Sequence, residues 1–237
     1  MIRKSIAFTL AETLIVIGII GVVSALTLPN LNSSTGEKEK VAKVKKLHQN
    51  LEDAVGRSIA IYGPINEWKA LDNDASAQLA RFGNRLTEFM KLSKSCGLLA
   101  TPTCMAYNTI KIGSSNLVLQ SSVPYQSILA DGTSFFISLP RYGTADYVVT
   151  FDIDGSKKGA NVAGKDIFSF LISSDGVIAP QQGEDFSGLT TGMGERVTNW
   201  VINFDNLDYL KANQNGKCND SNVTLNALAN PPVTSCK

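Results

Sequence analysis

One apolar stretch near the N-terminus constrains this chain more than any other feature. From Phe8 to Leu28 there are 21 residues, and Glu12 is the one charged residue among them. As a helix rising 1.5 Å per residue, the stretch would be roughly 30 Å long, the hydrocarbon thickness of a bilayer. Arg3 and Lys4 precede it, which places the N-terminus on the cytoplasmic side. We therefore expect a single-pass helix in the inner or cytoplasmic membrane, with the rest of the chain periplasmic or extracellular.

Glu12 argues against three ordinary interpretations of this stretch. These are a secretory signal cut after Val23-Ser24-Ala25, a plain membrane anchor, and a buried core helix. A carboxylate inside an apolar helix costs on the order of 2.5–3.5 kcal/mol on insertion scales, so it calls for a partner or a function. A new α-amino group, freed by a cut before Phe8, would lie four residues from Glu12 or come from a neighbouring copy.

The N-terminus resembles the type IV pilins and the type II secretion pseudopilins. The resemblance rests on a short basic leader, a small residue, the motif Phe-Thr-Leu-x-Glu from Phe8 to Glu12, and the apolar helix. It implies that a prepilin peptidase cuts between Ala7 and Phe8 and that Phe8 is then N-methylated. It also implies that Glu12 pairs with the N-terminal amine of a neighbouring subunit, and that Pro29 is the family's helix-kinking proline. A proline there also predicts a bend or break near residues 27–30 on physical grounds.

The same resemblance implies partners and an order of segments. The partners would be copies of the chain or other pilin-like subunits, a prepilin peptidase/methylase, an assembly ATPase and a membrane platform. The sequence does not distinguish a pilus from a type II secretion pseudopilus or a DNA-uptake fibre. The expected segments are a leader (1–7), a transmembrane assembly helix (8–28), a helix continuing after the kink (29–62) and an exported globular domain (63–237).

The remaining sequence predicts an α+β fold with a mostly antiparallel sheet. Apolar residues recur every three or four positions between Glu37 and Tyr62, which is typical of an amphipathic helix. Its lysines form either a basic collar over anionic lipid or a solvated helix face, and we favour the solvated face. Two Asp-Gly turns indicate hairpins. The expected elements are helices over 75–94 and 196–212 and strands over 125–130, 134–139, 147–153, 166–173 and 176–179.

The chain has four cysteines, all on the expected outer side, where disulfides persist. Four cysteines allow three pairings. We predict the local pairing, Cys96 with Cys104 and Cys218 with Cys236, because each pair brackets a loop. A zinc site of four thiolates is disfavoured because the spacings contain no Cys-x-x-Cys pattern.

An aspartate-rich loop connects two of the predicted strands. Asp152, Asp154, Asn161 and Asp166 could supply oxygen ligands, and the glycines between them allow carbonyls to turn inward. Calcium is therefore a possible cofactor, and some pseudopilins hold calcium in such a loop. The alternative is a turn-rich connection whose aspartates cap backbone amides.

The net charge and the residue content argue against several classes of function. The net charge is +1, so no global basic field indicates nucleic-acid binding, and the single histidine disfavours His-based catalysis. No nucleophile–base pair stands out, and we do not expect an enzyme. The two functions that fit are a pilin-like assembly subunit and, as the alternative, a secreted or anchored extracytoplasmic binding domain, which would be calcium-dependent if the aspartate loop holds the ion.

Overall fold

The structure is a computed structural model that divides into two compact units, residues 1–39 and residues 40–237. It describes residues 10–68, 74–98, 104, 109–112, 115–118, 124–139, 147–155, 161–179, 195–213 and 215–237.

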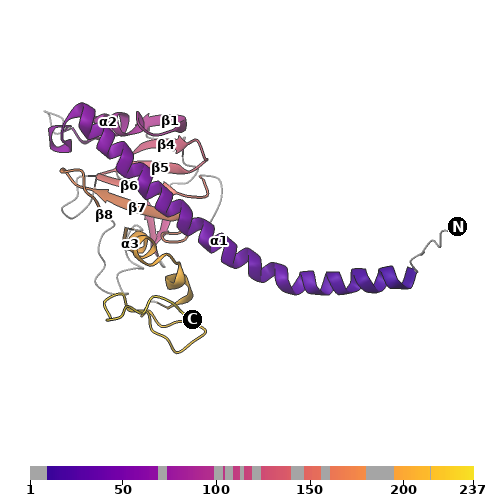
Figure 1. Ribbon diagram of the computed structural model, residues 1–237. Helices are drawn as coiled ribbons and strands as arrows, with labels where there is room; N and C mark the ends of the chain where they lie inside the picture. Colours follow the sequence, from indigo (N-terminus) through magenta and orange to yellow (C-terminus); the bar gives the residue numbers. More distant parts are fainter. Residues whose placement is uncertain are drawn as a thin grey trace, which may run out of the picture. The chain divides into compact units, whose positions relative to one another are not determined.

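Helix α1 (Leu10–Tyr62) is by far the longest element, with 53 residues (Figure 1). Helical backbone continues through Pro29, so the break that the sequence predicts near residues 27–30 does not occur. A proline in a helix interior removes one backbone donor, which the remaining hydrogen bonds of a long helix can tolerate.

The predicted transmembrane helix is wrong for the part of the chain that the structure describes. No helix there combines the length and the apolar character needed to cross a membrane. The same finding contradicts the predicted single-pass localisation in the inner membrane.

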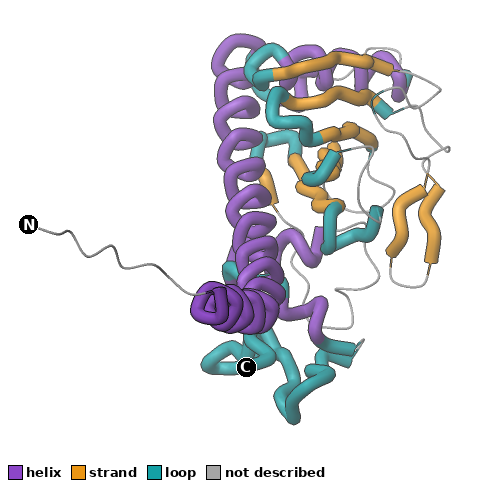
Figure 2. The backbone as a smooth tube through the Cα atoms, turned by 90° about the vertical axis from the view of Figure 1, so that its right-hand side faces the viewer, coloured by secondary structure: helices purple, strands orange, loops and turns teal. Residues whose placement is uncertain are grey.

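The second unit is built on an antiparallel sheet of six strands in the order β1-β4-β5-β6-β7-β8. The part of α1 after Lys40 lies along this sheet (Figures 1 and 2). A separate two-stranded ribbon pairs β2 with β3. The strands are β1 (Leu92–Leu98), β2 (Thr109–Ile112), β3 (Ser115–Val118), β4 (Tyr125–Leu129), β5 (Ser134–Ser138), β6 (Tyr147–Asp152), β7 (Ile167–Ile172) and β8 (Ile178–Ala179).

Alternate residues of the central strands face α1 and form the core with it. Side chains such as Phe135, Phe151 and Phe170 pack in one cluster with the apolar stripe of α1. The stripe itself is buried, as its spacing predicts, at Val41, Val44, Leu47, Leu51 and Val55. The fit is close at the turn between β7 and β8, where a Cβ added to Gly176 would lie 2.4 Å from the Ile59 Cδ1 atom.

The residues between these core positions carry buried polar side chains. The hydroxyls of Thr150 and Ser169 lie 2.8 Å apart across β6 and β7. On the neighbouring strands, the Ser134 hydroxyl donates to the Cys104 carbonyl, and the Cys104 N–H donates to the Gln126 side-chain oxygen. This sheet layer is therefore held by hydrogen bonds as well as by apolar contacts.

Two predicted helices are shorter than expected. Helix α2 (Ala75–Thr87) ends well before residue 94, because the chain turns and enters β1. Helix α3 (Glu195–Phe204) ends where Asp205 adopts a positive φ of 56°. Short 3-10 helices form η1 (Ile65–Trp68) and η4 (Asp208–Lys211).

Candidate functional site

The first turns of α1 expose a continuous set of large apolar side chains. Their exposed fractions run from 52% at Val16 to 80% at Leu10. Large contiguous apolar patches on a protein surface mark interaction surfaces, whereas single exposed apolar residues are common and need no explanation. We call this set the apolar segment, and it comprises Leu10, Leu14, Ile15, Val16, Ile17, Ile19, Ile20, Val22 and Val23.

The structure describes two of the four residues expected to take part in processing and assembly, Glu12 and Pro29. Glu12 lies in the first turn of α1, where the positive end of the helix dipole favours a carboxylate. Pro29 lies within the unbroken helix. Ala7 and Phe8, the predicted cleavage pair, lie outside the described residues. The structure thus places Glu12 at one end of the apolar segment.

The aspartate loop is held by its own hydrogen bonds. The Asp166 carboxylate accepts the N–H groups of Asn161, at 2.9 Å, and Val162, at 2.6 Å. Asp152 accepts the N–H of Gly155 at 3.2 Å. Asn161 has a φ of 53°, a left-handed conformation that asparagine tolerates better than most residues. These contacts are the amide capping that the sequence left open as the alternative to calcium binding.

The four candidate calcium ligands are not equivalent. Asp152 and Asp166 are buried and accept backbone N–H groups, whereas one side-chain oxygen each of Asp154 and Asn161 is buried and accepts no hydrogen bond from a described residue. Among the described residues, no three His, Cys, Asp or Glu side chains lie close enough to hold a metal ion. Calcium binding stays a prediction.

Lysines of α1 fasten the helix to both ends of this loop. The Lys40 ammonium donates to the Lys165 carbonyl at 2.9 Å, and the Lys43 ammonium donates to the Ile153 carbonyl. Lys45 pairs with Asp205, beyond α3, at 2.6 Å. These lysines act within the domain, a role that the helical pattern alone does not reveal.

Residues of the C-terminal region also contact the aspartate loop. The Tyr209 hydroxyl donates to the Gly164 carbonyl, and burial raises the pKa of this phenol well above its usual value. Gly164 has a φ of 81°, and a Cβ there would lie 3.0 Å from a Val197 methyl group. Contacts from α1 and from the C-terminal region therefore converge on the loop, which argues for a structural role.

Both predicted disulfides are present, with the local pairing. Cys96, in β1, is bonded to Cys104, and Cys218 is bonded to Cys236. The described part of the chain contains no free cysteine. The second bond closes the C-terminal region after η4, where few side chains reach the core.

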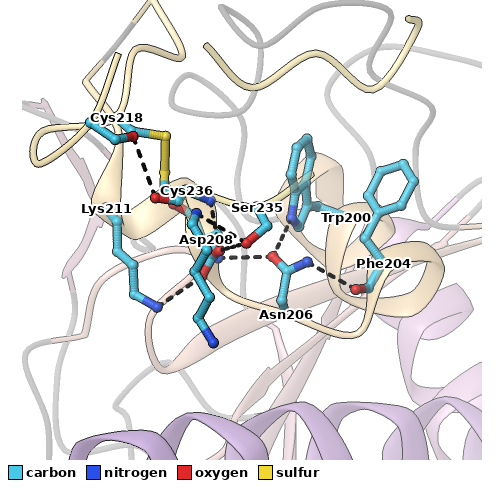
Figure 3. A network of polar contacts seen from close by, with 10 residues as sticks. Trp200, Phe204, Asn206, Asp208, Lys211, Cys218, Ser235 and Cys236 are labelled. Atoms are coloured by element: carbon cyan, nitrogen blue, oxygen red, sulfur yellow. Dashed lines mark hydrogen bonds and ion pairs between the residues drawn. A yellow bond between two sulfur atoms is a disulfide. The ribbon is translucent and has the colours of Figure 1, made fainter. Parts of the chain in front are cut away.

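A carboxylate that sequence reasoning missed anchors this closed region (Figure 3). Asp208 accepts hydrogen bonds from the Lys211 ammonium at 2.8 Å, and from the Ser235 hydroxyl and the Cys236 N–H at 2.9 Å each. Burial alone would raise the pKa of Asp208, but these hydrogen bonds outweigh it and hold the pKa below its usual value. The spacing of Asp208 and Lys211 is a sequence signal for an ion pair. The contacts with Ser235 and Cys236 depend on the disulfide.

Asp208→Asn is expected to lower the free energy of unfolding by about 2 kcal/mol at pH 7, because a buried carboxylate with charge-assisted hydrogen bonds is lost. The folded pKa lies below the unfolded value of about 3.9, so the stabilisation is complete above that pH and is lost as the pH falls through the folded pKa. Urea unfolding at pH 7 and pH 3 measures this, with the exposed Asp220→Asn as control. A difference from wild type that is the same at both pH values would contradict the assignment.

Comparison with known proteins gives no relative for this chain. No protein-family model, no curated protein and no solved structure matches it. The function must therefore be argued from the residues and contacts above.

Proposed function

We propose that the chain is a subunit of a pilin-like filament, cut before Phe8 and assembled with copies of itself or with related subunits through the apolar segment. Two observations support this. The sequence from Phe8 to Glu12 carries the prepilin motif, and the apolar segment that follows is exposed. The second observation carries the proposal, because an exposed set of this size needs a partner to cover it.

The energy available from covering the apolar segment is large enough to drive assembly. Burying one large aliphatic side chain contributes about 1.5–3 kcal/mol. The nine side chains of the segment, even half-covered by neighbours, would contribute roughly 7 kcal/mol or more. Each subunit in a helical filament contacts several others, so this gain recurs and offsets the entropy lost on association.

Glu12 would specify how the subunits align. Packed among apolar side chains of neighbouring copies, its carboxylate requires a positive partner, and the amine freed before Phe8 is the one that the motif supplies. A charge pair that forms in one alignment alone selects that alignment over staggered ones. By the same resemblance, a prepilin peptidase would make the cut and methylate the new N-terminus.

A polar substitution in the apolar segment tests the proposal. Ile17→Asn is expected to reduce incorporation into filaments about tenfold, because an amide would be buried without a partner. The measurement is the fraction of the chain that sediments with filaments from cells producing the full-length protein. Ile61→Asn is a matched control, because Ile61 lies on the same helix and is 63% exposed, against 67% for Ile17.

The control also separates folding from assembly. We expect both variants to melt at the wild-type temperature, since both side chains are exposed. Equal incorporation of Ile17→Asn and wild type would contradict the proposal.

A further inference from the structure

Three segments of the chain have the sequence Asn-x-Ser or Asn-x-Thr, in which the middle residue is not proline. This pattern is the acceptor for the attachment of an oligosaccharide to an asparagine side chain in the surface loops of secreted proteins. Because the pattern is short, the surroundings of each asparagine must decide whether it can be used. The three segments begin at Asn32, Asn219 and Asn222.

The segment that begins at Asn32 is not in a surface loop. Residues 32–34 lie inside helix α1, whose backbone hydrogen bonds run from Leu10 to Tyr62. Residues two positions apart in a helix do not face each other, whereas the pattern is recognised through an asparagine and a hydroxyl at that spacing. The structure therefore sets this segment aside.

The other two segments overlap in one hairpin of the C-terminal region. Lys217 and Thr224 pair in an antiparallel bridge, and the Cys218 N–H donates to the Val223 carbonyl at 2.9 Å. Residues 219–222 form the turn between these two pairs. The second disulfide holds the hairpin at the residue directly before the turn. The turn is thus a surface loop with a fixed base.

The disulfides indicate the kind of compartment in which this hairpin folds. Both cysteine pairs are bonded, and the described residues include no free cysteine. Such bonds form in oxidising compartments, among them the endoplasmic reticulum and the bacterial periplasm. Oligosaccharides are attached to asparagine in secreted proteins, which pass through the same compartments. The hairpin therefore meets the chemical condition for this modification.

The hydroxyl groups of the two overlapping segments differ, and the difference favours Asn222. The pattern requires a hydroxyl two residues after the asparagine. For Asn219 this is the Ser221 hydroxyl, which donates to the Cys236 carbonyl and accepts a backbone N–H within the turn, each at 3.4 Å. For Asn222 it is the hydroxyl of Thr224, which is exposed and makes no hydrogen bond with a described residue. An enzyme can bind the Thr224 hydroxyl without breaking a contact of the domain.

The Asn222 side chain is also accessible. Asn222 is exposed, and no hydrogen bond joins its amide to a described residue. Other exposed asparagines of the region have a local role, since the Asn213 side chain accepts the Asn215 N–H and the Asn226 side chain accepts the Leu228 N–H, both at 2.9 Å. A sugar attached to Asn222 would extend into solvent and displace no buried group.

From these observations we propose that Asn222 is the acceptor of an N-linked oligosaccharide. The donor is an oligosaccharide carried on a polyprenyl diphosphate, and an oligosaccharyltransferase catalyses the transfer. The Asn222 amide nitrogen forms a bond to the anomeric carbon of the first sugar. The bond from that carbon to the phosphate oxygen breaks, and the polyprenyl diphosphate leaves with the electron pair. The amide nitrogen releases one of its two protons to solvent, and nothing is oxidised or reduced.

This inference goes beyond filament assembly and does not depend on it. It requires neither the cut before Phe8 nor any contact of the apolar segment. Its test leaves Glu12 and the apolar segment unchanged, so the two proposals can fail separately.

The test is mass spectrometry of the full-length gene product, purified from the cells that produce it naturally. After reduction of the disulfides, trypsin cuts after Lys217 and releases residues 218–237, because no lysine or arginine lies between them and the final Lys237. We expect this peptide to exceed the mass of its sequence by the mass of an oligosaccharide. Fragment ions that keep the sugar should place it on Asn222.

Variants of the pattern show whether the enzyme recognises it. Thr224→Ala is expected to lose the glycan completely although Asn222 is retained, whereas Thr224→Ser should keep it. Asn215→Gln is the matched control, because Asn215 is an exposed asparagine of the same region outside the pattern, and this variant should keep the glycan. All three variants should melt at the wild-type temperature, since both residues are exposed.

Any of three results would overturn the inference. The first is a wild-type peptide 218–237 that has the mass of its sequence alone. The second is a glycan that persists in Thr224→Ala. The third is a set of fragment ions that places the sugar on a residue other than Asn222, such as the Ser221 hydroxyl.

Discussion

Replacing Glu12 with alanine is expected to reduce incorporation into filaments roughly a hundredfold or more. The reason is the charge left behind. In the proposed filament the carboxylate meets the amine of a neighbouring subunit among apolar side chains, and removing one partner leaves the other buried without compensation. Such a loss costs about 3–5 kcal/mol, far more than the loss of an exposed ion pair.

The measurement is the yield of the variant in sedimented filaments when it is produced together with wild type. Glu12→Gln keeps the size of the side chain and removes its charge, so it should fail as alanine does. Thr13→Ala is the matched control, because Thr13 is the exposed neighbour whose hydroxyl donates to the Leu10 carbonyl within the same helix. Normal yields of Glu12→Ala would show that charge pairing does not direct assembly.

Removing the disulfide between Cys218 and Cys236 is expected to lower the free energy of unfolding by about 3 kcal/mol. The bond joins residues 18 apart and so limits the freedom of the unfolded chain. In the folded state, the region it closes has few buried apolar side chains, Leu225 among them, and depends on Asp208 for several hydrogen bonds.

Urea unfolding of the double variant Cys218→Ser/Cys236→Ser measures this loss, and limited proteolysis of the folded protein shows where it acts. The variant should be cut between residues 219 and 235 under conditions that leave wild type intact. Cys96→Ser/Cys104→Ser removes a bond between residues 8 apart and should cost somewhat less, with no new cutting in the C-terminal region. An unchanged free energy of unfolding in the Cys218→Ser/Cys236→Ser variant would contradict the account of this region.

Local signals in the sequence predicted local structure well. The Asp131-Gly132 turn joins β4 and β5, the stripe from Val41 to Val55 is buried, and both disulfides form between cysteines that are near in sequence. Each of these follows from residues within about 20 positions of one another, where turn geometry, helical period and loop closure act directly.

Contacts between distant segments were the ones that sequence reasoning missed. Helix α2 was expected to reach residue 94, but pairing with β4 draws residues 92–98 into strand β1. Lys43 was interpreted as part of a solvated face, yet it bonds to the Ile153 carbonyl across 110 residues. Helical spacing predicts which face of the helix a residue lies on, but it does not predict which carbonyl group the side chain of that residue contacts.

The predicted transmembrane helix was also wrong for the part of the chain that the structure describes. The stretch from Phe8 to Leu28 is apolar in sequence, but no helix among the described residues combines the length and the apolar character needed to cross a membrane. In the proposed filament, the same apolar side chains that suggested a membrane span cover those of neighbouring subunits.

The mass of the N-terminal peptide of the mature protein tests the central claim most directly. The account predicts a peptide that begins at Phe8 and carries one added methyl group on its amine, so that Glu12 is the fifth residue of the mature chain. A mature protein that keeps its first seven residues, or that begins after the apolar segment, for example at Leu26, would contradict it.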